Sequence, residues 1–122
     1  MKQDIINWLD TIERIDGIPP VEVIAFNFGL YEDETGYKVY LAGSFEYDED
    51  DDDWAAVEPP TGLHRHLSLP DNLQSETWEF VLDSCANALT ALESEERLNM
   101  PLLKNAIAIT TGFDEGDLIK IR

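Results

Sequence analysis

Cysteine and basic residues are scarce in this sequence, and long apolar runs are absent. The single cysteine, Cys85, cannot form an intramolecular disulfide, so the fold must depend on a packed core, and a cytoplasmic location is expected. No apolar stretch approaches the roughly 20 residues needed to cross a bilayer. Because an acidic surface is also repelled by anionic headgroups, we expect no membrane attachment.

The shortage of basic residues makes the chain strongly acidic. Against 8 Lys and Arg there are 26 Asp and Glu, and the net charge is −18, far beyond the magnitude of about 2 to 8 that suits a small soluble domain. Direct nucleic-acid binding is disfavoured, because phosphates would be repelled. From Glu22 to Glu58, twelve acids accompany one base, Lys38. Since halophilic adaptation or simple solubility would spread acids evenly, this clustering favours a basic protein partner.

Length and composition indicate one domain. The chain has 122 residues, of which 43% are hydrophobic and 10% aromatic, so it carries more apolar side chains than disordered acidic segments do. A chain of this length can bury roughly two thirds of the surface that its unfolded form exposes. No internal repeat or flexible linker divides it, and we expect a single domain over residues 1–122.

The N-terminal segment is predicted to be an amphipathic helix. Apolar residues recur at helical spacing over residues 4–15, and Ile15 extends the same stripe. Gly17 suits a left-handed C-terminal cap, and Pro19 and Pro20 prevent the helix from continuing. The helix should therefore end before the two prolines.

An antiparallel hairpin is predicted next. Residues 21–30 and residues 37–47 each alternate apolar and polar positions with a period of two, and a turn at 33–36 joins them. Gly43 interrupts the apolar face of the second strand. Such a gap is typical of a β-bulge or of a close approach by another element.

A long helix is predicted in the second half. Asp71 and Gln74 have the spacing of a capping box, with Ser75 as an alternative cap. The helix should run to about Leu92, with Trp78 on its apolar face.

Residues 106–110 and 118–121 alternate as strands about a turn at 112–117, which predicts a second hairpin. The order of these elements predicts an α+β fold. We expect an antiparallel sheet of four to five strands with two main helices packed on one face.

An acidic run, residues 48–53, is the strongest local feature. Adjacent carboxylates repel one another and gain nothing from a core, so the run should lie at the surface. It could be only a mobile, solvated loop; as an interface it would offer a dense anionic patch beside a large aromatic anchor. The candidate partner-binding residues here are Glu46, Asp48, Glu49, Asp50, Asp51, Asp52, Asp53 and Trp54.

The acidic run does not fit a calcium loop. Asp48, Asp50 and Asp52 have the one-three-five spacing of an EF-hand. The sixth position is Asp53, where glycine is needed, and the twelfth is Pro59, where a bidentate Glu is needed. Weak binding of Ca²⁺ or Mg²⁺ stays open, but we expect no dedicated metal site.

Two histidines and the cysteine are the candidate ligands or nucleophiles. If residues 63–69 form a strand, His64 and His66 point to the same face and could hold Zn²⁺ together with a third ligand. No such ligand is obvious in the sequence, so ordinary strand positions are the simpler interpretation. Cys85 lies on the apolar stripe of the long helix and is expected to be a buried small hydrophobe. We therefore expect neither metal nor cofactor.

The closing turn groups three more acids between two strands. Its glycines indicate turn geometry, and Asp114, Glu115 and Asp117 form a candidate second anionic contact patch. The sequence contains no glycine-rich phosphate loop, no Ser-His-Asp ordering and no metalloprotease signature. We expect no enzymatic activity.

On a small α+β frame, these features resemble the bacterial immunity proteins encoded beside polymorphic and contact-dependent-inhibition toxins. The resemblance rests on residues 46–58, with the step Asp53-Trp54-Ala55, and on the closing turn at 111–117, together about a sixth of the chain. It implies inhibition of a cationic toxin domain, often a nuclease, by covering its nucleic-acid-binding cleft or a neighbouring surface. It identifies no individual binding residue.

Charge complementarity leads independently to a compatible function. A nuclease is basic where it meets phosphate, so an acidic domain suits it, and steering can raise association rates by about 10- to 1,000-fold. One alternative is a DNA mimic that inhibits a nucleic-acid-binding protein; mimicry needs carboxylates spaced like phosphates, whereas the densest acids here are consecutive. Another is a small metal-dependent enzyme that uses His64, His66 and acids of the two turns.

Overall fold

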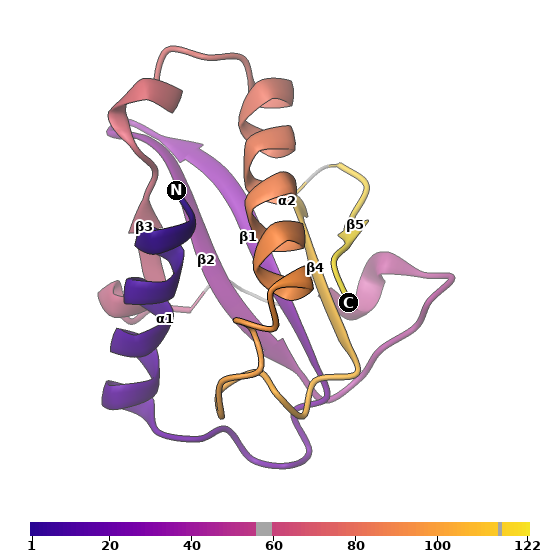
Figure 1. Cartoon of the computed structure of the whole chain (residues 1–122). Coiled ribbons are helices and arrows are strands. Elements are labelled where there is room, and N and C mark those ends of the chain that lie inside the picture. The colour runs from indigo at the N-terminus through magenta and orange to yellow at the C-terminus, as the bar shows by residue number, and fades with distance from the viewer. Residues whose placement is uncertain (56–59, 115) are drawn as a thin grey trace.

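The computed structural model describes residues 1–55, 60–114 and 116–122; Glu58, Pro59 and Glu115 lie outside the described residues. Within these residues, two α-helices pack on one face of a five-stranded sheet (Figure 1). The helices are α1 (Lys2–Asp16) and α2 (Trp78–Ser94). The strands are β1 (Ala25–Asp33), β2 (Gly36–Ser44), β3 (His66–Ser68), β4 (Ala108–Phe113) and β5 (Ile119–Lys120).

The strand order confirms the expected α+β fold and adds one parallel pair. The order is β3-β2-β1-β4-β5, in which β1–β2, β2–β3 and β4–β5 pair antiparallel and β1–β4 pair parallel. Both predicted hairpins are present. A parallel pair needs a long connection, and the chain segment that contains β3 and α2 provides it before β4 pairs with β1. None of the helices in the described ranges has the length and apolar character needed to span a membrane.

The β1–β2 turn is stabilised by a carboxylate. Asp33 accepts hydrogen bonds from the backbone nitrogen and hydroxyl of Thr35, at 2.8 and 2.7 Å, and pairs with Lys38 at 2.9 Å. Gly36 has a φ of 120°, which L side chains rarely adopt. The bonds from Lys38 and Thr35 lower the pKa of Asp33 to about 2.

We expect Asp33 to titrate near pH 2 in the folded protein. Because its folded pKa lies below the ordinary aspartate value of 3.8, the turn contributes stability that is fully present above about pH 4 and is lost as the pH falls toward 2. An NMR titration of the side-chain carboxyl carbons measures this, with Lys38→Gln as the variant that should raise the midpoint. An ordinary midpoint in the parent protein would contradict the turn geometry.

The main core lies between the sheet and the two helices. Alternate residues of β1, including Phe26, Phe28 and Leu30, face this side, as the period-two pattern predicts. From α1, the side chains buried against them are Ile5, Trp8, Leu9 and Ile12. The expectation for Ile15 was wrong: this residue is 59% exposed, and the buried positions of the helix end at Ile12.

The opposite face of the sheet, which points away from the helices and is called the second face below, is also partly buried. Asn27 and Thr110, neighbours on β1 and β4, are 4% exposed, and the Thr110 hydroxyl donates to Asn27 Oδ1 at 2.9 Å. Ala25 and Ala108, on the same two strands, are fully buried there. Tyr47, Trp54 and Ala55, from the segment after β2 that contains the acidic run, pack with these two alanines.

The predicted start of α2 was wrong. Thr77 is the N-cap and accepts a hydrogen bond from the Phe80 backbone nitrogen, whereas residues 71–73 form a separate 3-10 turn. The Gln74 amide accepts from the Tyr37 backbone nitrogen at 2.7 Å and donates to the Tyr37 and Leu69 carbonyl oxygens. The Gln74 side chain, which the local pattern assigned to a capping box, therefore forms tertiary hydrogen bonds instead, two of them with β2.

Two further expectations need correction. Residues 63–69 form a strand only over His66–Ser68; Leu63–Arg65 is a 3-10 turn in which Leu63 is 88% exposed. Trp78 is half exposed and stacks edge-on against Phe113 of β4, because it lies at the first turn of α2, at the margin of the core.

Candidate functional site

The acidic run forms an ordered turn on the molecular surface. Asp48 Oδ1 accepts a hydrogen bond from the Asp50 backbone nitrogen at 2.9 Å, and Asp51 Oδ1 accepts one from the Asp53 backbone nitrogen at 2.9 Å. These are the local bonds by which aspartate favours turns. A 3-10 helix over Asp52–Ala55 follows. All six carboxylates of the run are exposed, as expected.

Trp54 is buried, which contradicts its expected role as an exposed anchor. It is only 7% exposed and packs with Ala25 and Ala108 on the second face of the sheet. Tyr47 contacts it edge to face, with ring centroids 5.2 Å apart. The indole therefore fixes the acidic run to the sheet, and a hydrophobic contact with a partner must come from other residues.

The closing turn lies beside the acidic run. Asp52 Oδ2 accepts a hydrogen bond from the Leu118 backbone nitrogen at 3.3 Å, and Leu118 also packs against the cluster around Trp54. Figure 1 shows the segment after β2 folding against the C-terminal strand. The acidic run and the closing turn, which were predicted as separate patches, thus lie together on the second face of the sheet. We call the two together the acidic surface.

Asp114 has a structural contact as well as an exposed carboxylate. The Tyr40 hydroxyl donates to Asp114 Oδ1 at 2.9 Å, and burial together with this bond raises the pKa of Tyr40 above its usual range. Tyr40 therefore stays a neutral donor and fixes the start of the closing turn. Asp117 is exposed, and Glu115 lies outside the described residues.

The carboxylates of this surface have no basic partner in the described part of the chain. Every ion pair between described residues lies elsewhere, for example Lys2–Glu95, Lys38–Asp33 and Arg122–Glu93. An open hollow of about 550 Å³ lies within the acidic surface; its lining residues are Ile24, Glu46, Tyr47, Asp48, Asp51, Asp53 and Trp54. Among the described residues, no group of His, Cys, Asp and Glu is arranged to hold a metal ion.

The strand interpretation was wrong for His64 and right for His66. His64 lies in a 3-10 turn, where Nε2 is 3.0 Å from the Asp16 carboxylate. His66 is on β3; its Nδ1 lies 2.7 Å from the Tyr31 hydroxyl oxygen, and its Nε2 contacts the Pro60 carbonyl oxygen. The two imidazoles thus contact different protein groups.

Cys85 is a buried residue of α2, as expected. It is 3% exposed, and burial raises the pKa of its thiol to about 12. At neutral pH the thiolate is therefore scarce, and the residue is unsuited to nucleophilic catalysis.

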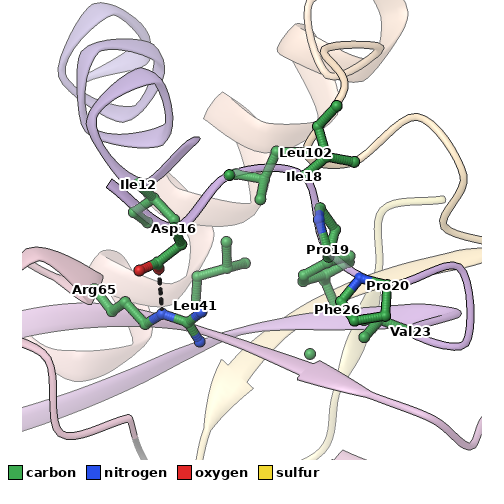
Figure 2. Close-up of a pocket in the computed structure, with 12 residues that line it drawn as sticks. Ile12, Asp16, Ile18, Pro19, Pro20, Val23, Phe26, Leu41, Arg65 and Leu102 are labelled. Carbon is green, nitrogen blue, oxygen red and sulfur yellow. Dashed lines mark hydrogen bonds and ion pairs between the residues drawn. The ribbon is translucent and has the colours of Figure 1, made fainter. Parts of the chain in front are cut away.

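One feature that the sequence did not indicate is an apolar hollow at the end of the sheet. It has a volume of about 210 Å³ and lies between the end of α1, the loop after it and β2 (Figure 2). Asp16 and Arg65, paired at 2.7 Å, lie at one side of it. The apolar side chains that line it are Ile12, Ile18, Pro19, Pro20, Val23, Phe26, Leu41 and Leu102. The one sequence feature that could have pointed to this hollow is the group of apolar residues around the two prolines.

Gly43 helps to shape this hollow. A Cβ atom at this position would lie 2.8 Å from Val23 Cγ1 and 3.2 Å from Phe26 Cε1. The gap in the apolar face of β2 is therefore a close approach by the α1–β1 loop, one of the two explanations that the sequence left open.

Comparisons with known proteins add no relative to this picture. No protein-family model matches the chain, and neither the curated proteins nor the solved structures contain a match.

Proposed function

We propose that this chain is an acidic inhibitor that binds a basic protein domain, and that this domain is a toxin with nuclease activity. The main supporting observation is the acidic surface made by the run at 48–53 and the adjoining closing turn. Its described carboxylates are exposed and have no basic partner among the described residues. Uncompensated surface charge of one sign favours fast association with a partner of the opposite sign. A nuclease has such a basic surface where it binds phosphate.

The ordered geometry of the acidic run also supports binding. Local hydrogen bonds to Asp48 and Asp51 fix the shape of the segment. The bond from Leu118 to Asp52 and the burial of Trp54 hold it on the sheet. A surface that is already ordered loses less conformational entropy when it binds. The run is therefore better suited to recognition than a freely mobile acidic loop would be.

The proposal also holds that the protein acts without catalysis. The buried thiol of Cys85 supports this, because burial keeps its thiolate scarce, and so does His66, whose two ring nitrogens already contact protein groups. A DNA mimic is less well supported, since the carboxylates of the run follow one another within a compact turn instead of lying at phosphate-like intervals along an extended face.

We expect association with the partner to slow steeply as salt is added. The test measures stopped-flow association with a basic nuclease toxin domain between about 0.01 and 1 M salt, where the Debye length falls from about 30 to about 3 Å. The rate constant should fall at least about tenfold, because steering between exposed charges is screened.

The same preparation tests inhibition. Adding one equivalent of the chain should abolish nuclease activity, and removing it at high salt should restore that activity. An association rate that does not change with salt would remove the electrostatic basis of the proposal. Binding without any loss of nuclease activity would contradict inhibition.

A further inference from the structure

Exposed apolar side chains gather at the end of the sheet where β1 and β4 begin and β2 ends. Ile24 connects these three strands, because its nitrogen bonds to Ser44 at 2.9 Å and its carbonyl oxygen accepts from Ile107 at 2.8 Å. We define the apolar end by its four exposed side chains, Ile18, Val21, Phe45 and Ile107, which are 67%, 76%, 68% and 60% exposed. Single exposed apolar residues are common, whereas a group of them indicates an interaction site.

The apolar end adjoins the hollow described above. Ile18 and Leu102 both line the hollow (Figure 2). Val21 and Phe45 are close in the chain to two other lining residues, Val23 and Gly43. With about 210 Å³, the hollow is smaller than the pockets of about 300 to 1,000 Å³ that enclose drug-sized ligands. It is suited to a single apolar side chain of another protein.

Charge at the apolar end favours a basic occupant. Glu22 follows Val21 in the chain, and Glu46 follows Phe45 and begins the acidic surface. Arg65 at the hollow is paired with Asp16, whereas Arg14, near the end of α1, and Lys104, in the loop before Ile107, have no such pairing among the described ion pairs. A second copy of a chain with a net charge of −18 would be repelled, as would a lipid or nucleic-acid surface.

We propose that the apolar end receives an apolar side chain of the basic partner, while Lys or Arg residues next to that side chain contact Glu22, Glu46 and the acidic run. This inference rests on the proposed function, in which the partner is a basic protein. It assigns the role of hydrophobic anchor site to Phe45, Ile18 and the hollow in place of Trp54. Interfaces of this kind combine a buried apolar centre with a charged rim.

Two matched peptides test the assignment without knowledge of the natural partner. One consists of lysines and arginines around a central phenylalanine, and in the other a serine replaces the phenylalanine. We expect the phenylalanine peptide to bind about tenfold more tightly, because its ring leaves water. In NMR spectra of the labelled protein it should shift the amides of Ile18 and the hollow together with those of the acidic residues, whereas the serine peptide should shift only those of Glu22, Glu46 and the acidic run.

Phe45→Ala and Ile18→Ala should remove most of the preference for the phenylalanine peptide and leave binding of the serine peptide unchanged. Phe80→Ala is the matched control, since Phe80 is also half exposed but lies at the first turn of α2, away from this end. It should behave like the parent protein. Thermal melting establishes that each variant is folded.

The outcomes separate this inference from the proposed function. Equal binding of both peptides, with shifts confined to Glu22, Glu46 and the acidic run, overturns the apolar anchor site and leaves the basic partner in place. Failure of both peptides to bind at low salt counts against the basic partner, and the anchor site falls with it. Self-association in sedimentation experiments that Phe45→Ala abolishes would assign the apolar end to a second copy and overturn the inference.

Discussion

Replacing Trp54 with alanine should lower the free energy of unfolding by about 3 to 5 kcal/mol, the usual loss for a buried Trp or Phe truncated to alanine. The indole packs with Ala25 and Ala108 and contacts Tyr47 edge to face. Its removal would leave a cavity on the second face of the sheet and release the acidic run. Urea unfolding followed by circular dichroism measures the loss.

Trp78→Ala is the control for this prediction. Trp78 is 53% exposed and contacts Phe113 at the margin of the core, so its truncation should cost clearly less. Trp54→Phe should retain much of the stability, because an aromatic ring still fills the site. If Trp54→Ala unfolds like the parent protein but binds the toxin domain poorly, then the indole acts at the interface and not in the core.

Changing Asp50, Asp51, Asp52 and Asp53 to Asn should weaken binding to the basic toxin domain about a hundredfold at low salt, while stability is retained or increased. Each exposed ion pair is worth about 0.2 to 1 kcal/mol, and four lost together can reach this factor. Asparagine keeps an oxygen that can accept the bonds from Asp53 and Leu118. Relief of repulsion among neighbouring carboxylates favours the folded state.

Matched neutralisation elsewhere is the control. Asp10, Glu76, Asp83 and Glu96 are exposed acids outside the acidic surface. Changing them to Asn or Gln removes the same total charge, so any weakening through net charge alone will be the same in both variants. Binding by the first variant that equals binding by the control would show that the run has no local role. A lower melting temperature without weaker binding would assign the run to folding.

The sequence predicted the elements whose signals are local. The stripe at residues 4–15 and the apolar residues before Leu92 identified both helices, because a helix that packs on one side must repeat its apolar residues at its own period. The alternation of residues 21–30 predicted the central strand in the same way, although the strand begins at Ala25. The exposure of the acidic run also followed from the sequence, since a cluster of like charges cannot enter a core.

Local signals failed where tertiary contacts compete for a side chain. Gln74 could cap a helix in isolation, but two backbone groups of β2 and the Leu69 carbonyl oxygen take its amide instead. The same applies to His64 and His66, since their rings contact Asp16 and Tyr31. Asp16 and Tyr31 are distant from the two histidines in the sequence, so no spacing pattern predicts these contacts. They become neighbours of the histidines only when the chain has folded.

By itself, the sequence determined the fold class, the two helices, the two hairpins and the acidic surface, because periodicity and charge act between residues that are close in the chain. The tertiary structure alone decided the parallel pairing of β1 with β4, the burial of Trp54 and the hollow beside Ile18. Each of these depends on which face of the sheet a distant segment covers. A tryptophan such as Trp54 suits an interface and a core equally well. It is buried here because it packs against Ala25 and Ala108 on the second face of the sheet.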